Sequence, residues 1–110
     1  RLTTTNCGVA SMARSRRYHP LVADDLANAV GHYDEVSVEL GNRFRDAIRE
    51  RLESITDFPE SYACIKEGLR AAMTGRFPYV ILYEIHDEAV AILGVFHAAS
   101  DQEGWFGRSL

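Results

Sequence analysis

Cysteine, proline and long apolar runs are scarce in this sequence of 110 residues. The two cysteines, Cys7 and Cys64, lie far apart and form no Cys-X-X-Cys or Cys/His pair, which speaks against a disulfide framework and a zinc site. Unpaired cysteines are typical of a reducing compartment. No apolar run reaches the roughly 18 residues that cross a bilayer, and the N-terminus has no signal-peptide pattern. We therefore expect a cytoplasmic protein that has no membrane partner.

Only three prolines and eight glycines, an ordinary glycine content, exclude collagen-like and low-complexity chains. With 46% hydrophobic and 25% charged residues, the chain has the composition of a folded globular domain. Its 12 basic and 16 acidic side chains give a formal net charge of -4, which argues against a protein that coats nucleic-acid phosphates. We expect a single domain over residues 14–110, and residues 1–13 as a leader or cloning remnant without regular structure.

Two amphipathic helices are predicted in the first half of the chain. Pro20 suits a first helical position, and Asp24 and Asp25 follow in the first turns, where carboxylates are favourable. Apolar residues recur at three- and four-residue steps as far as residue 34, and again over residues 40–55. Phe58-Pro59 ends the second helix, because proline disfavours helical geometry in the residue before it. The short connection predicts an antiparallel helix hairpin that must pack on another layer.

The second half predicts three antiparallel strands, at residues 69–73, 77–85 and 89–96, which are rich in Val, Ile, Leu, Tyr and Phe. The last two are apolar at successive positions, as interior strands covered on both faces are. We interpret the short, basic Arg16-Arg17-Tyr18 as an edge strand, with a nucleic-acid arm as the alternative. The expected fold is α+β, in the order β-α-α-β-β-β, with the helix hairpin packed on a small, mainly antiparallel sheet.

Several segments resemble one family of bacterial proteins. Phe77-Pro-Tyr-Val-Ile-Leu-Tyr83 precedes Ile92-Leu-Gly-Val-Phe-His97 and residues 101–105, and it follows His19-Pro20 and Asp24-Asp25-Leu26. In this order and spacing, over residues 15–108, the chain resembles the ParE/RelE superfamily of toxins, also called plasmid stabilisation proteins. The resemblance implies a toxin encoded beside an antitoxin that binds and neutralises it, without a cofactor. RelE-like members cut messenger RNA in the ribosome and ParE-like members poison DNA gyrase, so fold alone does not choose between them.

The residues themselves argue against RNA cleavage. Attack by the 2′-hydroxyl needs a base, an acid and cations that neutralise the phosphate. Ribonuclease members of the superfamily resemble one another in placing basic residues across the sheet and a Tyr or His near the C-terminus. When Tyr83 is matched to the tyrosine of their third strand, the corresponding positions hold Ala71, Met73, Val80, Ser100 and Phe106. His97 is the one weak catalytic candidate, with Asp101 to orient it, and a histidine that closes a strand is the plainer interpretation.

Seven residues are candidates for contacts with a target or an antitoxin. Tyr79 and Tyr83 share a strand face, where they either stack on bases or, more commonly, pack beneath helices. Trp105 lies in a polar tail and is either folded back on the sheet or exposed as an interface anchor. The full set is Phe44, Arg76, Tyr79, Tyr83, Asp101, Trp105 and Arg108. We expect an antitoxin to cover the apolar groove beside the helix hairpin and the edge of the sheet, and a free edge also permits a homodimer.

The favoured hypothesis is a ParE-like toxin that arrests growth by binding an essential target, with DNA gyrase as the candidate, and that its antitoxin neutralises. An enzyme is the less favoured interpretation: a RelE-like, ribosome-dependent mRNA endoribonuclease that needs no metal, with the ribosome and mRNA as partners. A third hypothesis is an inactive toxin-like protein that only binds its antitoxin. The histidines form no pair with metal-ligand spacing, so no metal site is expected.

Overall fold

The computed structural model describes residues 15–108, so the leader expected over residues 1–13 lies outside the described part of the chain. Helices and strands follow one another in the order that the sequence predicts, with a few additions. The elements are β1 (Ser15–Tyr18), α2 (Val22–Val36), α3 (Val38–Asp57), the 3-10 turn η1 (Pro59–Ser61), β2 (Ala63–Lys66), β3 (Leu69–Thr74), β4 (Phe77–His86), β5 (Ala89–His97) and α4 (Gln102–Phe106).

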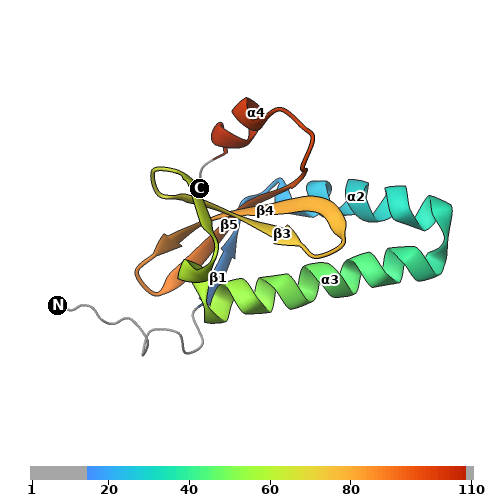
Figure 1. Ribbon diagram of the computed structural model, residues 1–110, viewed down its shortest axis with the longest axis horizontal. Coiled ribbons are helices and arrows are strands. Elements are labelled where there is room, and N and C mark those ends of the chain that lie inside the picture. Colours follow the sequence, from blue (N-terminus) through green and yellow to red (C-terminus); the bar gives the residue numbers. More distant parts are fainter. Residues whose placement is uncertain (1–14, 109–110) are drawn as a thin grey trace.

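The strands form one five-stranded sheet in the order β1-β5-β4-β3-β2. β1 pairs in parallel with β5, and every other neighbouring pair is antiparallel. The long helices α2 and α3 run side by side as a hairpin, and α4 lies apart from them at the C-terminal end of the chain (Figure 1). The predicted α+β fold and its three antiparallel strands are confirmed. Strand β2 and helix α4 are elements that the sequence pattern did not predict.

A single residue joins the two long helices. The Ser37 backbone N–H donates to the Tyr33 carbonyl at the end of α2, and the Ser37 hydroxyl accepts from the Leu40 N–H at 3.0 Å and so caps α3. Next to this joint, a Cβ atom on Gly41 would lie 1.6 Å from the Asp34 carboxylate, so only glycine lets the helices approach so closely. Helix α2 thus extends to Val36 instead of ending near residue 34, as the sequence suggested.

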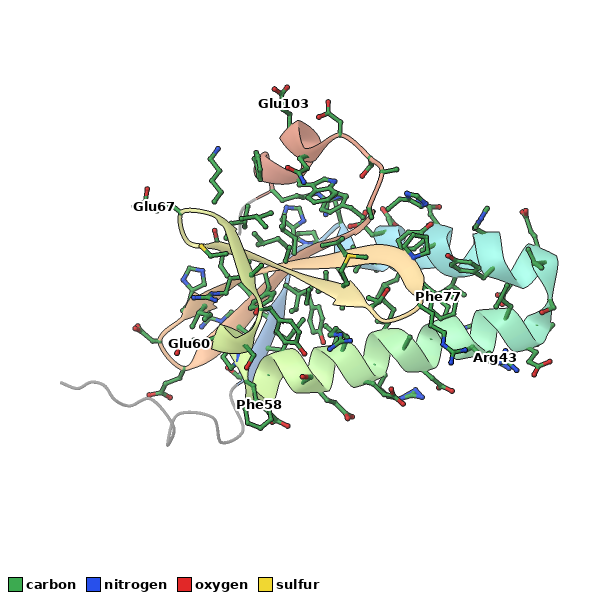
Figure 2. The ribbon with its side chains drawn as sticks, in the orientation of Figure 1. Arg43, Phe58, Glu60, Glu67, Phe77 and Glu103 are labelled. Carbon is green, nitrogen blue, oxygen red and sulfur yellow. The ribbon has the colours of Figure 1, made fainter. Side chains whose placement is uncertain are left out.

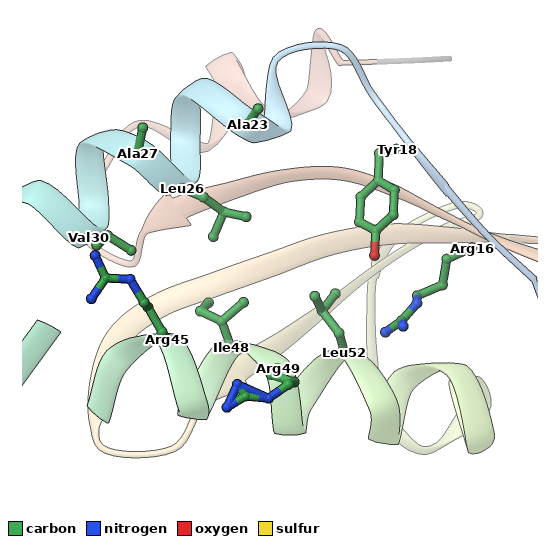
Figure 3. A pocket seen from close by; sticks show the side chains of 10 residues that line it. All are labelled: Arg16, Tyr18, Ala23, Leu26, Ala27, Val30, Arg45, Ile48, Arg49 and Leu52. Atoms are coloured by element: carbon green, nitrogen blue, oxygen red, sulfur yellow. The ribbon is translucent and has the colours of Figure 1, made fainter. Parts of the chain in front are cut away.

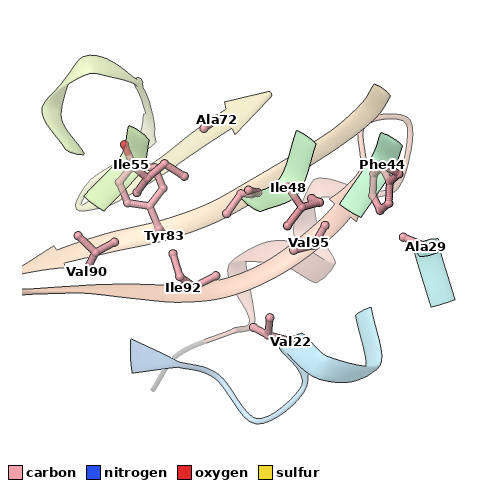
Figure 4. Close-up of a cluster of buried hydrophobic side chains, with 11 residues drawn as sticks. Val22, Ala29, Phe44, Ile48, Ile55, Ala72, Tyr83, Val90, Ile92 and Val95 are labelled. Atoms are coloured by element: carbon pink, nitrogen blue, oxygen red, sulfur yellow. The ribbon is translucent and has the colours of Figure 1, made fainter. Parts of the chain in front are cut away.

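Buried side chains form two apolar clusters, one on each face of the sheet. The larger cluster fills the space between the sheet and the helix hairpin (Figure 4) and consists of Val22, Ala29, Phe44, Ile48, Ile55, Ala72, Ile81, Tyr83, Val90, Ile92 and Val95. The smaller cluster consists of Leu69, Val80, Leu82, Ala91, Leu93 and Trp105. Because Trp105 belongs to α4, the C-terminal end of the chain covers the second face. The expectation that β4 and β5 are covered on both faces is confirmed.

Candidate partner-binding site

An open groove lies between α2 and α3, beside strand β1 (Figure 3). Its volume is about 540 Å³. The groove is lined by Arg16 and Tyr18 from β1, by Ala23, Leu26, Ala27 and Val30 from α2, and by Arg45, Ile48, Arg49 and Leu52 from α3. Most of these side chains are apolar, and the charged ones are all arginines.

Side-chain size explains why the groove stays open. Ala23 and Ala27 lie one turn apart on α2 and present only methyl groups to it. Ile48 and Leu52, one turn apart on α3, form its opposite wall (Figure 3). Tyr18 stands at one end with 47% of its surface exposed. An exposed apolar hollow rimmed by charged groups is typical of a surface that binds another polypeptide.

Three arginines border the groove, and two of them are ion-paired. Arg45 donates to Asp34 at 2.9 Å, and Arg49 pairs with Asp46 on the exposed side of α3. Arg16 forms no ion pair with any of the residues 15–108. Elsewhere on the molecule, acidic side chains such as Glu60 and Glu103 project from the surface (Figure 2). In a chain of net charge -4, a groove bordered by arginines favours an acidic partner.

Three of the predicted contact residues lie in the C-terminal strap, residues 101–108, and two of them, Trp105 and Arg108, fold against the sheet. Trp105 is 3% exposed, stacks on the Phe96 ring with centroids 5.5 Å apart and donates from Nε1 to the Ser100 hydroxyl at 2.9 Å. Arg108 forms an ion pair with Asp25 and lies over the Phe96 ring. Of the two positions considered for Trp105, the structure shows the one folded back on the sheet.

Three aromatic candidates lie at or near the core beneath the hairpin. Phe44 and Tyr83 are each 0% exposed, so their side chains offer no surface to a partner in this conformation. The Tyr83 hydroxyl donates to the Pro59 carbonyl at 2.5 Å, and burial raises the pKa of Tyr83 to about 12. Tyr79 is half-buried, and its ring meets those of Phe44 and His97 edge-on. These positions favour packing roles, and they lie apart from the lining of the groove.

The remaining predicted residues, His97, Asp101 and Arg76, are exposed. His97 ends β5, and its Nδ1 accepts from the Ala99 N–H at 3.0 Å. The expected partner Asp101 does not orient it: the Asp101 carboxylate caps α4 by accepting from the Glu103 N–H at 3.0 Å. Arg76 is exposed in the turn between β3 and β4. The structure therefore does not bring the seven predicted residues together into one site.

Neither a metal site nor a membrane span is found among residues 15–108. No group of three or more His, Cys, Asp or Glu side chains in this part of the chain is placed to hold a metal ion. None of its helices is long and apolar enough to cross a membrane.

The sequence signal for the groove was present but ambiguous. Leu26, Val30, Ile48 and Leu52 belong to the apolar stripes that predicted the two helices, and a stripe of this period fits a closed core as well as an open groove. The arginines of the rim resembled ordinary solvated charges. What distinguishes them is that Arg45, Arg49 and Arg16 border the same hollow, which only the tertiary structure reveals.

Fold and groove together define a small α+β protein with an open, apolar groove that arginines border. The family model for the ParE toxin of type II toxin-antitoxin systems, parDE, matches residues 16–102. The chain belongs to this ParE toxin family. It is 33% identical over 90 residues to Toxin ParE2 of Mycobacterium tuberculosis, in both the CDC 1551 / Oshkosh and the ATCC 25618 / H37Rv strains. Each match covers 78% of this chain and 83% of the relative.

The fold is also similar to a solved structure, that of the chromosomal ParDE toxin-antitoxin system from P. aeruginosa. The TM-score is 0.65 at 19% sequence identity, and the match covers 76% of this chain and 95% of the other. At this level of identity the likeness establishes the fold and leaves partners and targets to be argued separately.

Proposed function

We propose that this protein arrests bacterial growth by binding DNA gyrase in the cytoplasm, and that an antitoxin neutralises it by filling the groove between α2 and α3. Membership of the ParE family supports the toxin class. The observation that carries the antitoxin part of the proposal is the groove, because it leaves apolar side chains of both helices open to solvent.

An amphipathic helix with acidic flanks fits the groove best. The lining residues run from Ala23 to Val30 on α2 and from Arg45 to Leu52 on α3, about two helical turns on each side. A partner helix would place apolar side chains against the partly exposed Leu26 and Leu52, and carboxylates toward the arginines of the rim. A helix in a groove buries its apolar face without needing a free strand edge.

The residues at the positions compared with the ribonuclease members favour binding over RNA cleavage. Positions 71, 73, 80, 100 and 106, where ribonuclease members of the superfamily carry basic residues or a tyrosine, hold none of these groups. Val80 instead belongs to the apolar cluster on the second face, and Ala71 and Phe106 pack against that cluster. Neither a base nor a phosphate-binding cation is supplied by these positions.

The target is tested by pulse-labelling DNA and protein synthesis just after induction of the chain without an antitoxin. We expect DNA synthesis to fall first, and purified protein to inhibit supercoiling by gyrase in vitro. An earlier loss of protein synthesis would favour the ribosome-dependent nuclease. Normal synthesis of both, with folded protein present, would favour the inactive antitoxin-binding protein.

The groove is tested with a matched pair of variants on α2. Ala27 lines the groove and Asn28, the next residue, is exposed outside it. Ala27→Glu and Asn28→Glu each add one negative charge. Only the first places that charge in the apolar groove, where it would also face the carboxylates of the proposed partner helix. We expect Ala27→Glu to weaken binding of the protein encoded by the adjacent gene by about a hundredfold, and Asn28→Glu to leave it within about threefold of the parent. Equal affinities in two folded variants would place the antitoxin elsewhere.

A further inference from the structure

A second hollow, of about 200 Å³, continues the groove along α3. It is lined by Arg16 from β1 and by Glu53, Thr56 and Asp57 from the last two turns of α3. Arg16 also lines the groove, so it marks the place where the two hollows meet. Figure 3 shows Arg16 reaching from β1 toward α3 at the end of the groove where Leu52 lies. A polypeptide that lies in the groove and continues past Leu52 would therefore enter the second hollow.

One ridge of α3 borders both hollows, and its charge changes sign along the helix. The ridge consists of four exposed side chains at intervals of four residues: Arg45, Arg49, Glu53 and Asp57. Residues four apart are neighbours on a helix surface. The two arginines border the groove, and the two carboxylates border the hollow that continues it. A surface with opposite charges at its two ends selects a partner whose charges have the complementary order.

The two carboxylates of the ridge are placed unfavourably for the chain itself. Neither Glu53 nor Asp57 forms an ion pair with any of the residues 15–108. They are four residues apart on one helix and therefore repel each other. The last turn of α3 has no basic residue, so the negative end of the helix dipole is met by Asp57 instead of a cation. Arg16 is one cation against two carboxylates in this hollow, so a cationic group from a partner would relieve both unfavourable interactions.

We propose that Glu53 and Asp57 bind lysine or arginine side chains of the antitoxin, just past the stretch of antitoxin that fills the groove, and so fix the position of the antitoxin along α3. This inference rests on the function proposed above and adds an order of charges to it. Acidic side chains of the antitoxin lie opposite Arg45 and Arg49, and basic ones lie opposite the two carboxylates. An antitoxin displaced along the ridge by one turn would bring like charges together, which is unfavourable.

The test compares variants that reverse charges on two sides of α3. The double variant Glu53→Lys/Asp57→Lys reverses the two carboxylates of the ridge. Glu50→Lys makes the same kind of change at an exposed position of α3 outside the groove and outside the hollow that continues it. The free double variant should be at least as stable to urea as the parent, because cations near the C-terminus of a helix are favourable. Weaker binding by this variant would then not be a consequence of unfolding.

Affinity for the purified protein encoded by the adjacent gene is measured by isothermal titration calorimetry at low and at high salt. We expect the double variant Glu53→Lys/Asp57→Lys to bind at least about tenfold more weakly than the parent at low salt. The difference should become smaller at high salt, because the charges of the ridge are exposed and are screened. Glu50→Lys should stay within about threefold of the parent at both salt concentrations.

Ala27→Glu in the groove separates this proposal from the one on which it rests. Weak binding by Ala27→Glu together with parental affinity of the double variant would keep the groove and overturn the role of Glu53 and Asp57. Parental affinity of both would overturn the groove and the ridge together. Tighter binding by the double variant would indicate a partner that is acidic along its whole length, and would overturn the proposed order of charges.

Discussion

Arg108 and Asp25 are joined by two hydrogen bonds, from Nη1 to Oδ2 at 2.9 Å and from Nη2 to Oδ1 at 3.0 Å, across 83 positions of sequence. Arg108 Nη1 also donates to the Leu93 carbonyl at 2.8 Å, and Asp25 Oδ2 accepts from the Val95 N–H at 3.0 Å. The pair therefore ties the first turn of α2, the middle of β5 and the C-terminal strap to one another. It connects the layers on the two faces of the sheet.

Arg108→Ala should destabilise the protein by about 2 to 4 kcal/mol, because both side chains are only 14% and 15% exposed and Asp25 would keep its charge in a sheltered position. Urea unfolding monitored by circular dichroism measures the change. Arg49→Ala is the control, since its pair with Asp46 is exposed on both sides and should cost less than about 0.5 kcal/mol. Equal costs for the two variants would contradict the assigned role of Arg108.

Gly94→Ala should disturb the packing around Arg108. A Cβ atom there would lie 2.5 Å from the Phe96 ring and 2.8 Å from Arg108 Nη1, so ring and guanidinium would both have to shift. We expect a loss of about 1 to 3 kcal/mol in the free energy of unfolding. Gly104→Ala is the matched control, because a Cβ atom on Gly104 meets nothing within 4 Å. The thermal midpoint should fall for the first variant only.

Stability should decrease between about pH 10 and pH 12 because of Tyr83. Burial raises its pKa in the folded protein to about 12, above the ordinary tyrosine value of about 10, so in this range the unfolded chain releases a proton that the folded chain retains. The contribution is complete below pH 10 and is lost as the pH rises, with a slope of at most about 1.4 kcal/mol per pH unit. Urea midpoints of the parent and of Tyr83→Phe measure it. The variant should be less stable at pH 8, where the Pro59 carbonyl loses its donor, and should show the smaller slope.

Association with the antitoxin should weaken as salt increases. The proposed acidic helix would approach a rim made by Arg16, Arg45 and Arg49, and attraction between exposed charges is screened within about 10 Å at 0.1 M salt. We expect Arg16→Gln to slow association by about threefold at low salt and to have little effect at high salt, in stopped-flow measurements. Arg43→Gln, on α3 but outside the groove, should not change the rate. A salt-independent rate would contradict an electrostatic contribution from the rim.

The sequence predicted the helix hairpin and the three long strands because their periodic apolar residues are buried by neighbouring elements close in sequence. It did not predict β2, whose residues are mostly exposed and which pairs with β3 alone. The sequence also could not decide whether Trp105 is buried or exposed. Its burial depends on stacking with Phe96 and on a hydrogen bond to Ser100, and both require the tertiary structure.

For the site, the sequence indicated an apolar groove beside the hairpin, but none of the seven candidate contact residues lines it. Phe44 and Trp105 are both buried. An apolar stripe on a helix lines a groove instead of a closed core only if the neighbouring helix lies far enough away. The separation of α2 and α3 depends on small side chains such as Ala27 and on the position of Tyr18.

The joint at Ser37 has a mechanical consequence. With one residue between α2 and α3, the helices cannot separate by sliding or by extending a loop, so a change in the width of the groove amounts to a rotation about that point. The displacement of a residue on either helix then increases with its distance from Ser37. Ala23 on α2 and Leu52 on α3, which line the groove at the end remote from Ser37, would move most for a given angle, and a partner helix would therefore enter from that end.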